Sequence, residues 1–160
     1  YDTIKALKSA GLNHVGAGNS INTAKLPFIY TSIEGKRLAI LNFAENEWST
    51  TKGDYPGAVG FDTVSNFQSI QEAKKNFDFV LVITHGGHEN YNLPSKSFRD
   101  LLRFFVDAGA DAIVNHHPHC ITGFEIYKGK PIYYSIGNFL FDKKSTDFNY
   151  WNKVSKVLSR

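Results

Sequence analysis

Five of the six histidines lie between positions 85 and 119, in two groups that each follow a run of apolar residues. His85 comes after the first run, and His116, His117 and His119 come after the second. In open α/β sheets, ligands bind in the loops just beyond the carboxyl ends of the strands, so the two groups can converge at one edge. Imidazole nitrogen suits Zn, Mn and Fe as a ligand. The spacing therefore predicts a divalent-metal site.

The run His116-His117-Pro118-His119 carries the strongest local signal for that site. A proline disfavours helical backbone in the residue before it, so this segment is expected to be extended. In an extended segment, His117 and His119 point to one side and His116 to the other. We therefore expect His85, His117 and His119 to be the metal ligands, with His116 a weaker candidate.

Three further residues are candidates for supporting roles in catalysis. His88 and Glu89 share a loop with Gly86 and Gly87, and glycines let the backbone approach a ligand closely. Either side chain could orient a metal ligand, the alternative being a solvated loop. Asn138 either contacts a metal-bound group or holds a left-handed turn.

The pattern of apolar and turn-forming residues predicts one α/β domain. Helices are expected at residues 2–10, 21–25, 64–75 and 95–108. Strands are expected at residues 12–15, 28–33, 37–43, 77–83, 111–114, 124–127 and 131–135. The helix between the strands at 77–83 and 111–114 makes a βαβ unit, so these two strands can lie parallel. Residues 44–60 are predicted to be a long loop, in which Glu47 or Trp48 lines the pocket.

Composition excludes several classes of function. The chain has 160 residues, 42% of them hydrophobic, which is enough to build a core. The net charge is +3 and no Lys/Arg run exceeds two residues, so we expect no nucleic-acid partner. Cys120 is the only cysteine, which excludes an internal disulfide and a four-cysteine zinc site. The longest apolar runs are too short to span a bilayer, so membrane attachment would need an anchor outside this chain.

Several short motifs, in this order, resemble those of the CapA family of capsule and poly-γ-glutamate synthesis proteins, within the calcineurin-like metallophosphoesterase superfamily. The motifs are Gly16-Ala17-Gly18 with Ala24 and Pro27, His85-Gly86-Gly87-His88-Glu89, Ala108-Gly109-Ala110-Asp111, His116-His117-Pro118-His119, and Tyr134-Ser135-Ile136-Gly137-Asn138-Phe139. Each motif is weak by itself. The histidine run followed by the Tyr-Ser-x-Gly-Asn-Phe segment is specific in combination.

The resemblance implies a fold and an activity. The fold would be part of a four-layer α/β/β/α sandwich with a two-metal site, holding Mn, Zn or Fe. His85, His117 and His119 would be the ligands from the second half of the domain. The activity would be hydrolysis of a phosphoester or of a bond in an anionic capsule-type polymer. The resemblance also implies a bacterial cell-envelope location and contact with the capsule synthesis machinery.

The chain departs from the family pattern in three ways. Gly86 stands where the family usually has tryptophan, which affects substrate contacts there. Asn115 stands where the family usually has glycine, and asparagine is the best non-glycine residue at positive φ. The early Gly-Asp and Asn-His elements that hold metals in the family do not precede Tyr1. We therefore expect residues 1–160 to be a single partial domain without the N-terminal metal-binding half, and nearly inactive alone.

Two other hypotheses remain open at this stage. The domain could be a non-catalytic polymer-binding or assembly component of an envelope complex that keeps the metal site for structure. A weaker alternative treats the histidines as core or surface residues of a domain that binds no metal, as we expect for the isolated His14. A metal-dependent activity screen separates the non-catalytic component from an enzyme. Elemental analysis tests the hypothesis of a domain that binds no metal.

Overall fold

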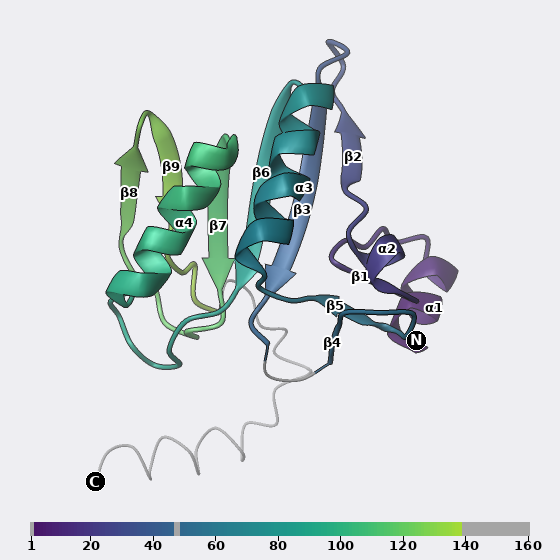
Figure 1. The fold of residues 1–160 in the computed structure, drawn as a ribbon, viewed down its shortest axis with the longest axis horizontal. Helices are drawn as coiled ribbons and strands as arrows, with labels where there is room; N and C mark the ends of the chain where they lie inside the picture. The colour runs from purple at the N-terminus through teal and green to yellow at the C-terminus, as the bar shows by residue number, and fades with distance from the viewer. Residues whose placement is uncertain (1, 47–48, 139–160) are drawn as a thin grey trace, which may run out of the picture.

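A six-stranded mixed sheet is the centre of the structure, a computed structural model that describes residues 2–46 and 49–138 (Figure 1). Its strands are β2 (Phe28–Thr31), β3 (Arg37–Ala44), β6 (Phe79–His85), β7 (Ala112–His116), β8 (Phe124–Tyr127) and β9 (Lys130–Tyr133). They are ordered β2-β3-β6-β7-β9-β8. The four inner strands are parallel, and β2 and β8 close the two edges as antiparallel hairpin partners. The predicted α/β class is confirmed.

Two amphipathic helices, α3 (Thr63–Asn76) and α4 (Lys96–Ala108), connect the inner strands and lie on the same side of the sheet (Figure 1). The Asp62 side chain caps α3 by accepting a hydrogen bond from the backbone N–H of Ser65 at 2.7 Å. Ser95 caps α4 in the same way, and Gly109, at φ +125°, ends it. Each helix returns the chain to the start of the next parallel strand.

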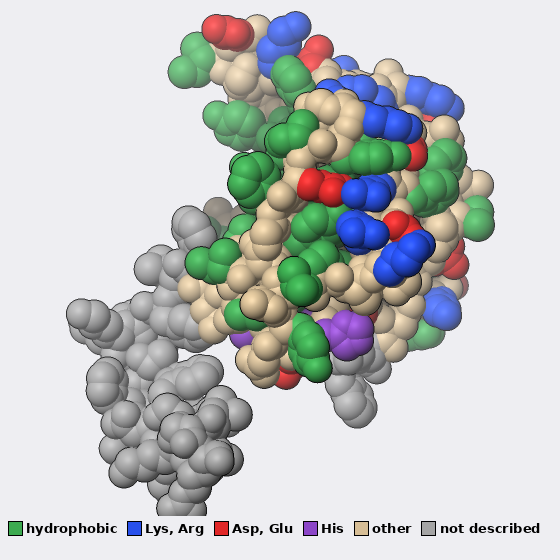
Figure 2. Space-filling model, turned by 90° about the vertical axis from the view of Figure 1, so that its left-hand side faces the viewer, with side chains coloured by type: hydrophobic (Ala, Val, Ile, Leu, Met, Phe, Trp, Pro, Cys, Tyr) green, Lys and Arg blue, Asp and Glu red, His purple; other side chains and the backbone are tan. Residues whose placement is uncertain are grey.

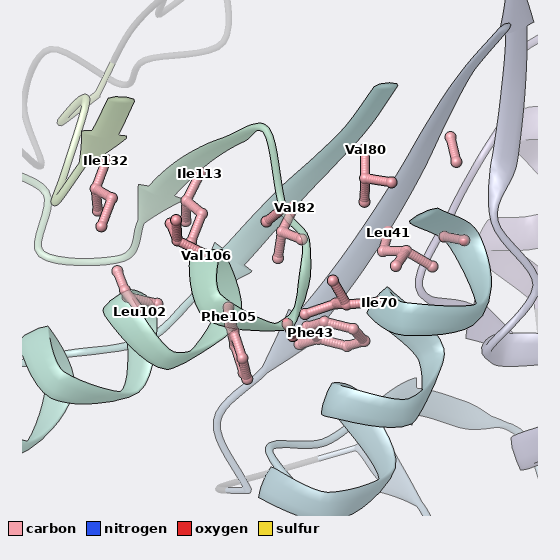
Figure 3. Packing of buried hydrophobic residues seen from close by; sticks show 14 of the residues in the cluster. Leu41, Phe43, Ile70, Val80, Val82, Leu102, Phe105, Val106, Ile113 and Ile132 are labelled. Carbon is pink, nitrogen blue, oxygen red and sulfur yellow. The ribbon is translucent and has the colours of Figure 1, made fainter. Parts of the chain in front are cut away.

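The core fills the space between these helices and the sheet (Figure 3). Alternate residues of the strands point toward the helices, as the period of two requires. Phe43 of β3 meets Phe105 of α4 edge to face, with ring centroids 5.6 Å apart. The fully buried large apolar side chains are Phe43, Val59, Ile70, Val80, Val82, Leu102, Phe105, Ile113 and Ile132.

The opposite face of the sheet is also apolar but much more exposed. Phe79, Phe124, Ile126 and Tyr133 are all exposed there, with 62% of Ile126 accessible. Viewed from the β8 side, hydrophobic side chains lie beside a mixed group of Lys, Arg, Asp and Glu (Figure 2). Exposed apolar area of this kind is typical of a surface that another element covers.

The remaining elements are small. Helices α1 (Asp2–Ser9) and α2 (Ile21–Ala24) flank a second sheet, ordered β1-β5-β4. Its strands are β1 (Ala17–Gly18), β4 (Thr50–Thr51) and β5 (Gly57–Val59). The strand expected at residues 12–15 is wrong, because pairing begins at Ala17. Residues 44–60 are only partly a loop, since two short strands lie within them and pair with each other.

Candidate metal centre

The register of the sheet brings the two histidine groups together. Ala44 of β3 pairs with His85 of β6, and His85 in turn pairs with His116 of β7. All three strands are parallel and end at this level, so their carboxyl ends form one edge. The histidine side chains in Figure 2 lie at the lower end of the view, toward which the arrows of β3, β6 and β7 point in Figure 1.

His85 lies between two other imidazole rings. Its Nε2 is 3.0 Å from Nδ1 of His117, and its Nδ1 is 3.0 Å from Nδ1 of His116. Only 9% of His117 is exposed. Burial, followed by the charges of the neighbouring histidines, lowers the pKa of His116 below its usual value. The predicted convergence of His85 with His117 at one sheet edge is confirmed.

The segment after β7 is not extended, which corrects the expected orientation of its side chains. Strand β7 ends at His116, and His117 and His119 have positive φ values of 129° and 58°. The carbonyl of Pro118 accepts a hydrogen bond from the backbone N–H of Asn90 at 2.8 Å, which ties this turn to the β6–α4 loop. His116 reaches His85 as its partner in the β6–β7 register, and the turn brings His117 to the other nitrogen of the same ring.

His119 lies next to the cluster and has its own partner. Its ring centroid is 6.1 Å from that of His117, and its Nδ1 donates a hydrogen bond to Asn138 Oδ1 at 2.8 Å. Asn138 thus contacts a candidate ligand. The left-handed residue of that turn is Gly137, at φ +63°, so the alternative role considered for Asn138 falls to its neighbour.

Sequence reasoning missed Glu45, which directly follows β3. Its Oε1 lies 2.9 Å from Nε2 of His117, and its Oε2 accepts a hydrogen bond from the backbone N–H of Gly87 at 3.3 Å. The 2.9 Å approach lacks hydrogen-bond geometry, which leaves Oε1 buried and without a hydrogen bond in the described part of the chain. The signal in the sequence was the position of this carboxylate, just after a predicted strand. Glu47 and Trp48, the residues that we expected to line the pocket, lie outside the described residues.

His88 and Glu89, the other predicted supporting residues, are both exposed. The ring of His88 packs against Tyr91, with centroids 6.2 Å apart. Glu89 makes no hydrogen bond or ion pair with the residues described here. The contact to a histidine that we expected of this loop comes instead from Glu45.

Asn115, one residue before His116, links the ends of β6, β7 and β9 through its side chain. It is fully buried, accepts a hydrogen bond from Thr84 Oγ1 at 2.7 Å, and donates to the carbonyls of Gly86 and Tyr134 at 2.9 and 2.7 Å. Its backbone φ is not positive, so tolerance of that conformation is not why asparagine stands here. Its side chain instead fixes the exits of β6 and β9, on either side of β7.

The space next to Gly86 is already occupied. A Cβ atom at this position would lie 2.7 Å from the ring of Phe61, which itself packs against Phe98. Both rings line an open pocket of about 400 Å³ that also contains Glu45 and His88. The rings of Phe61 and Phe98 therefore fill the space beside position 86.

The histidine pair fits a divalent ion, although the described residues form only part of a site. Two ligand nitrogens about 2.1 Å from an ion, and roughly at right angles, lie about 3 Å apart. The nitrogens that face each other in His85 and His117 have that separation, and the outer nitrogens of both rings lie near a partner. Within residues 2–46 and 49–138, no group of three or more His, Cys, Asp or Glu side chains is arranged to hold a metal.

Comparison with known sequences identifies the class of protein to which this fold and its histidine cluster belong. The chain belongs to the family described as bacterial capsule synthesis protein PGA_cap, whose sequence model matches residues 1–143. This family is metallophosphoesterase-like.

Among curated proteins, the chain is similar to several capsule-related ones. It is 40% identical over 148 residues to the capsule biosynthesis protein CapA of Bacillus anthracis, covering 89% of this chain and 36% of the relative. It is 40% identical over 144 residues to the PGA biosynthesis protein CapA of Bacillus subtilis (strain 168), and the match covers 89% of this chain and 38% of that relative. A probable polyglutamine synthesis accessory protein of Mycobacterium tuberculosis is 26% identical over 157 residues, and the match covers 88% of this chain and 40% of that relative.

The chain thus spans well under half the length of these relatives. No helix in the described residues is long and apolar enough to cross a membrane.

Proposed function

We propose that this chain is part of a metal-dependent hydrolase of capsule or poly-γ-glutamate biosynthesis, acting on a phosphoester or on an anionic polymer. The observation that carries the proposal is the 3.0 Å separation of His85 Nε2 and His117 Nδ1 at the carboxyl edge of the sheet. Ordinary surface histidines do not converge from two strands with their outer nitrogens near separate partners.

Each residue of the cluster has a distinct role in this proposal. His85 and His117 would hold a divalent ion between their facing nitrogens. His119 would contribute its Nε2 to a second ion, because Asn138 occupies its Nδ1. His116 would orient His85 through the Nδ1–Nδ1 contact. Divalent Mn, Zn or Fe bound there would polarise a phosphoryl or amide oxygen of the substrate.

Two features support an anionic substrate and an envelope location. The chain carries a net charge of +3, which favours the approach of an anionic polymer. The relatives carry capsule or poly-γ-glutamate biosynthesis in their names, which supports a role at the bacterial envelope beside the capsule synthesis machinery.

A second candidate function is a non-catalytic polymer-binding or assembly component. One observation favours it: the described residues form no group of three metal-ligating side chains, which a catalytic ion normally requires. In that case the histidine pair would hold a structural ion, or would bind the polymer without cleaving it.

Metal titration of this chain, followed by activity assays on the longer protein of which we propose it is part, tests the two functions. Isothermal titration with Mn²⁺ and Zn²⁺ should show binding that His85→Ala and His117→Ala each weaken and that His14→Ala leaves unchanged. A chromogenic phosphodiester and poly-γ-glutamate are then offered to that longer protein after it has been loaded with metal. Turnover that is lost in His117→Ala supports the hydrolase, and binding without turnover supports the assembly component. Equal affinity in all four proteins would rule out the metal site.

A further inference from the structure

We infer that Glu45 is a positioning residue that sets the orientation and tautomer of His117, so that Nδ1 of that ring faces His85. The inference rests on the proposed metal site for its consequence, but its first test does not require metal. It concerns a side chain that lies in none of the sequence motifs described above.

The carboxylate of Glu45 is held in place from the backbone. The residue follows β3 directly, and its N–H donates to the carbonyl of His85 at 2.9 Å, which extends the β3–β6 ladder by one step. Its Oε2 accepts the hydrogen bond from the N–H of Gly87. One carboxylate oxygen is therefore anchored to the loop that follows His85, and the other lies against His117.

Burial makes the approach of Oε1 to His117 energetically important. This oxygen has no hydrogen bond within the described residues, and a buried carboxylate oxygen without a donor destabilises the folded state. The group that can supply a donor is the ring nitrogen 2.9 Å away, Nε2 of His117. A small rotation of the carboxylate or the ring aligns the two groups.

A proton on Nε2 of His117 determines what the other side of the ring can do. Neutral imidazole carries one proton, so a proton held at Nε2 leaves the lone pair at Nδ1. That nitrogen faces Nε2 of His85. The result is a carboxylate–histidine arrangement of the kind that fixes the ligating nitrogen in metal sites. Because His117 is almost fully buried, water is poorly placed to replace the carboxylate.

The first experiment measures the tautomer in the metal-free full chain. Long-range ¹H–¹⁵N correlation spectra at pH 8 show which ring nitrogen of each histidine is protonated. The variants are Glu45→Gln, which keeps the shape and removes the charge, and Glu45→Ala. Glu89→Gln is the matched control, because Glu89 is an exposed acid two residues beyond Gly87. Urea unfolding of each protein shows whether it is folded.

The expected result is a proton on Nε2 of His117 in the wild type and in Glu89→Gln, and a shift toward Nδ1 in Glu45→Gln. A wild-type ring protonated at Nδ1, or a Glu45→Gln ring that stays as in the wild type, overturns the inference. If Glu45→Ala does not fold, Glu45→Gln alone decides.

The second experiment measures Mn²⁺ and Zn²⁺ affinity in the same proteins. Loss of the carboxylate should weaken binding about 10–100-fold, while Glu89→Gln changes little. Wild-type binding that Glu45→Gln leaves intact also overturns the inference. If neither the wild type nor His117→Ala binds metal, the proposed function fails, and the tautomer result still decides the role of Glu45.

Discussion

Nε2 of His85 lies 3.0 Å from Nδ1 of His117, although 32 residues separate the two in the chain. The contact follows from the parallel register of β6 and β7, which pairs His85 with His116 and places His117 in the turn just beyond. A shift of one residue in that register would reverse which face each side chain occupies. The candidate site therefore depends on the sheet as much as on the histidines.

The 160 residues alone are expected to show almost no hydrolytic activity. The described part of the chain contains a convergent histidine pair but no complete set of metal ligands. A two-metal mechanism needs both ions and a positioned acid or water. The purified chain is assayed with Mn, Zn and Fe on a generic phosphodiester, beside His117→Ala. Robust turnover that the variant abolishes would contradict this expectation.

Replacing Asn115 should destabilise the protein more than its size suggests. Asn115→Ala would leave the hydroxyl of Thr84 and the carbonyls of Gly86 and Tyr134 without their buried partner. We expect the free energy of unfolding to fall by about 2–4 kcal/mol. Urea denaturation measures it, with exposed Asn92→Ala as the control. A loss equal to that of the control would show that water replaces these hydrogen bonds.

Much of the fold was predictable because the strands and helices are strongly periodic. The helix expected at residues 95–108 is α4, and the βαβ unit around it is present with both strands parallel. The failures lie in short elements. Strands β1 and β4 are two residues long and have no period to detect, and their pairing comes from segments about 40 residues apart or from a local turn.

The contribution of Asp111 to the free energy of unfolding should depend on pH and be lost in acid. Burial alone would raise the pKa of this carboxyl, but hydrogen bonds from Lys130, Lys74 and the backbone N–H of Val80 hold it below the usual value of 3.8. A carboxyl whose pKa is lower in the folded state stabilises that state above its unfolded pKa. This contribution is lost as the pH falls below about 4.

The measurement for Asp111 is the free energy of unfolding between pH 3 and pH 7. We expect Asp111→Asn to cost about 2 kcal/mol at pH 7 and progressively less below pH 4. Asp54→Asn, at an exposed position, is the control. If wild type and Asp111→Asn keep the same difference down to pH 3, the folded-state carboxyl is not stabilised in its charged form.

A methyl group at Gly86 should strain the aromatic wall of the pocket. The added Cβ would lie 2.7 Å from the ring of Phe61 and 3.4 Å from that of Phe98, so a ring must move. We expect Gly86→Ala to lose about 1–3 kcal/mol of stability, and Gly123→Ala, whose Cβ meets nothing within 4 Å, to lose much less.

A double-mutant cycle with Phe61→Ala tests the cause of that strain. If the clash with Phe61 is responsible, Gly86→Ala should cost less in the Phe61→Ala background than in the wild type. Additive losses would place the strain elsewhere. Thermal or urea unfolding of the four proteins completes the cycle.

The candidate site was less predictable than the fold for a geometric reason. Strand ends can be located from periodicity, and this was enough to bring His85 and His117 together. The positive φ angles of His117 and His119 cannot be read from residue type, and they let His117 reach the ring that His116 already contacts through the β6–β7 register. Glu45 comes just after a predicted strand, but its contact with His117 depends on β3 lying next to β6, and that strand order cannot be read from local sequence patterns.

The order of strands in the large sheet has a consequence for the growth of the domain during synthesis. From β2 to β7 the spatial order follows the order of the chain, so each strand can add to an edge that already exists. Parallel pairing requires a whole helix to be made before the next strand can dock, which favours stepwise folding. Pulsed hydrogen exchange during refolding should therefore protect β3 and β6 before β9. Simultaneous protection of all strands would indicate a single cooperative step.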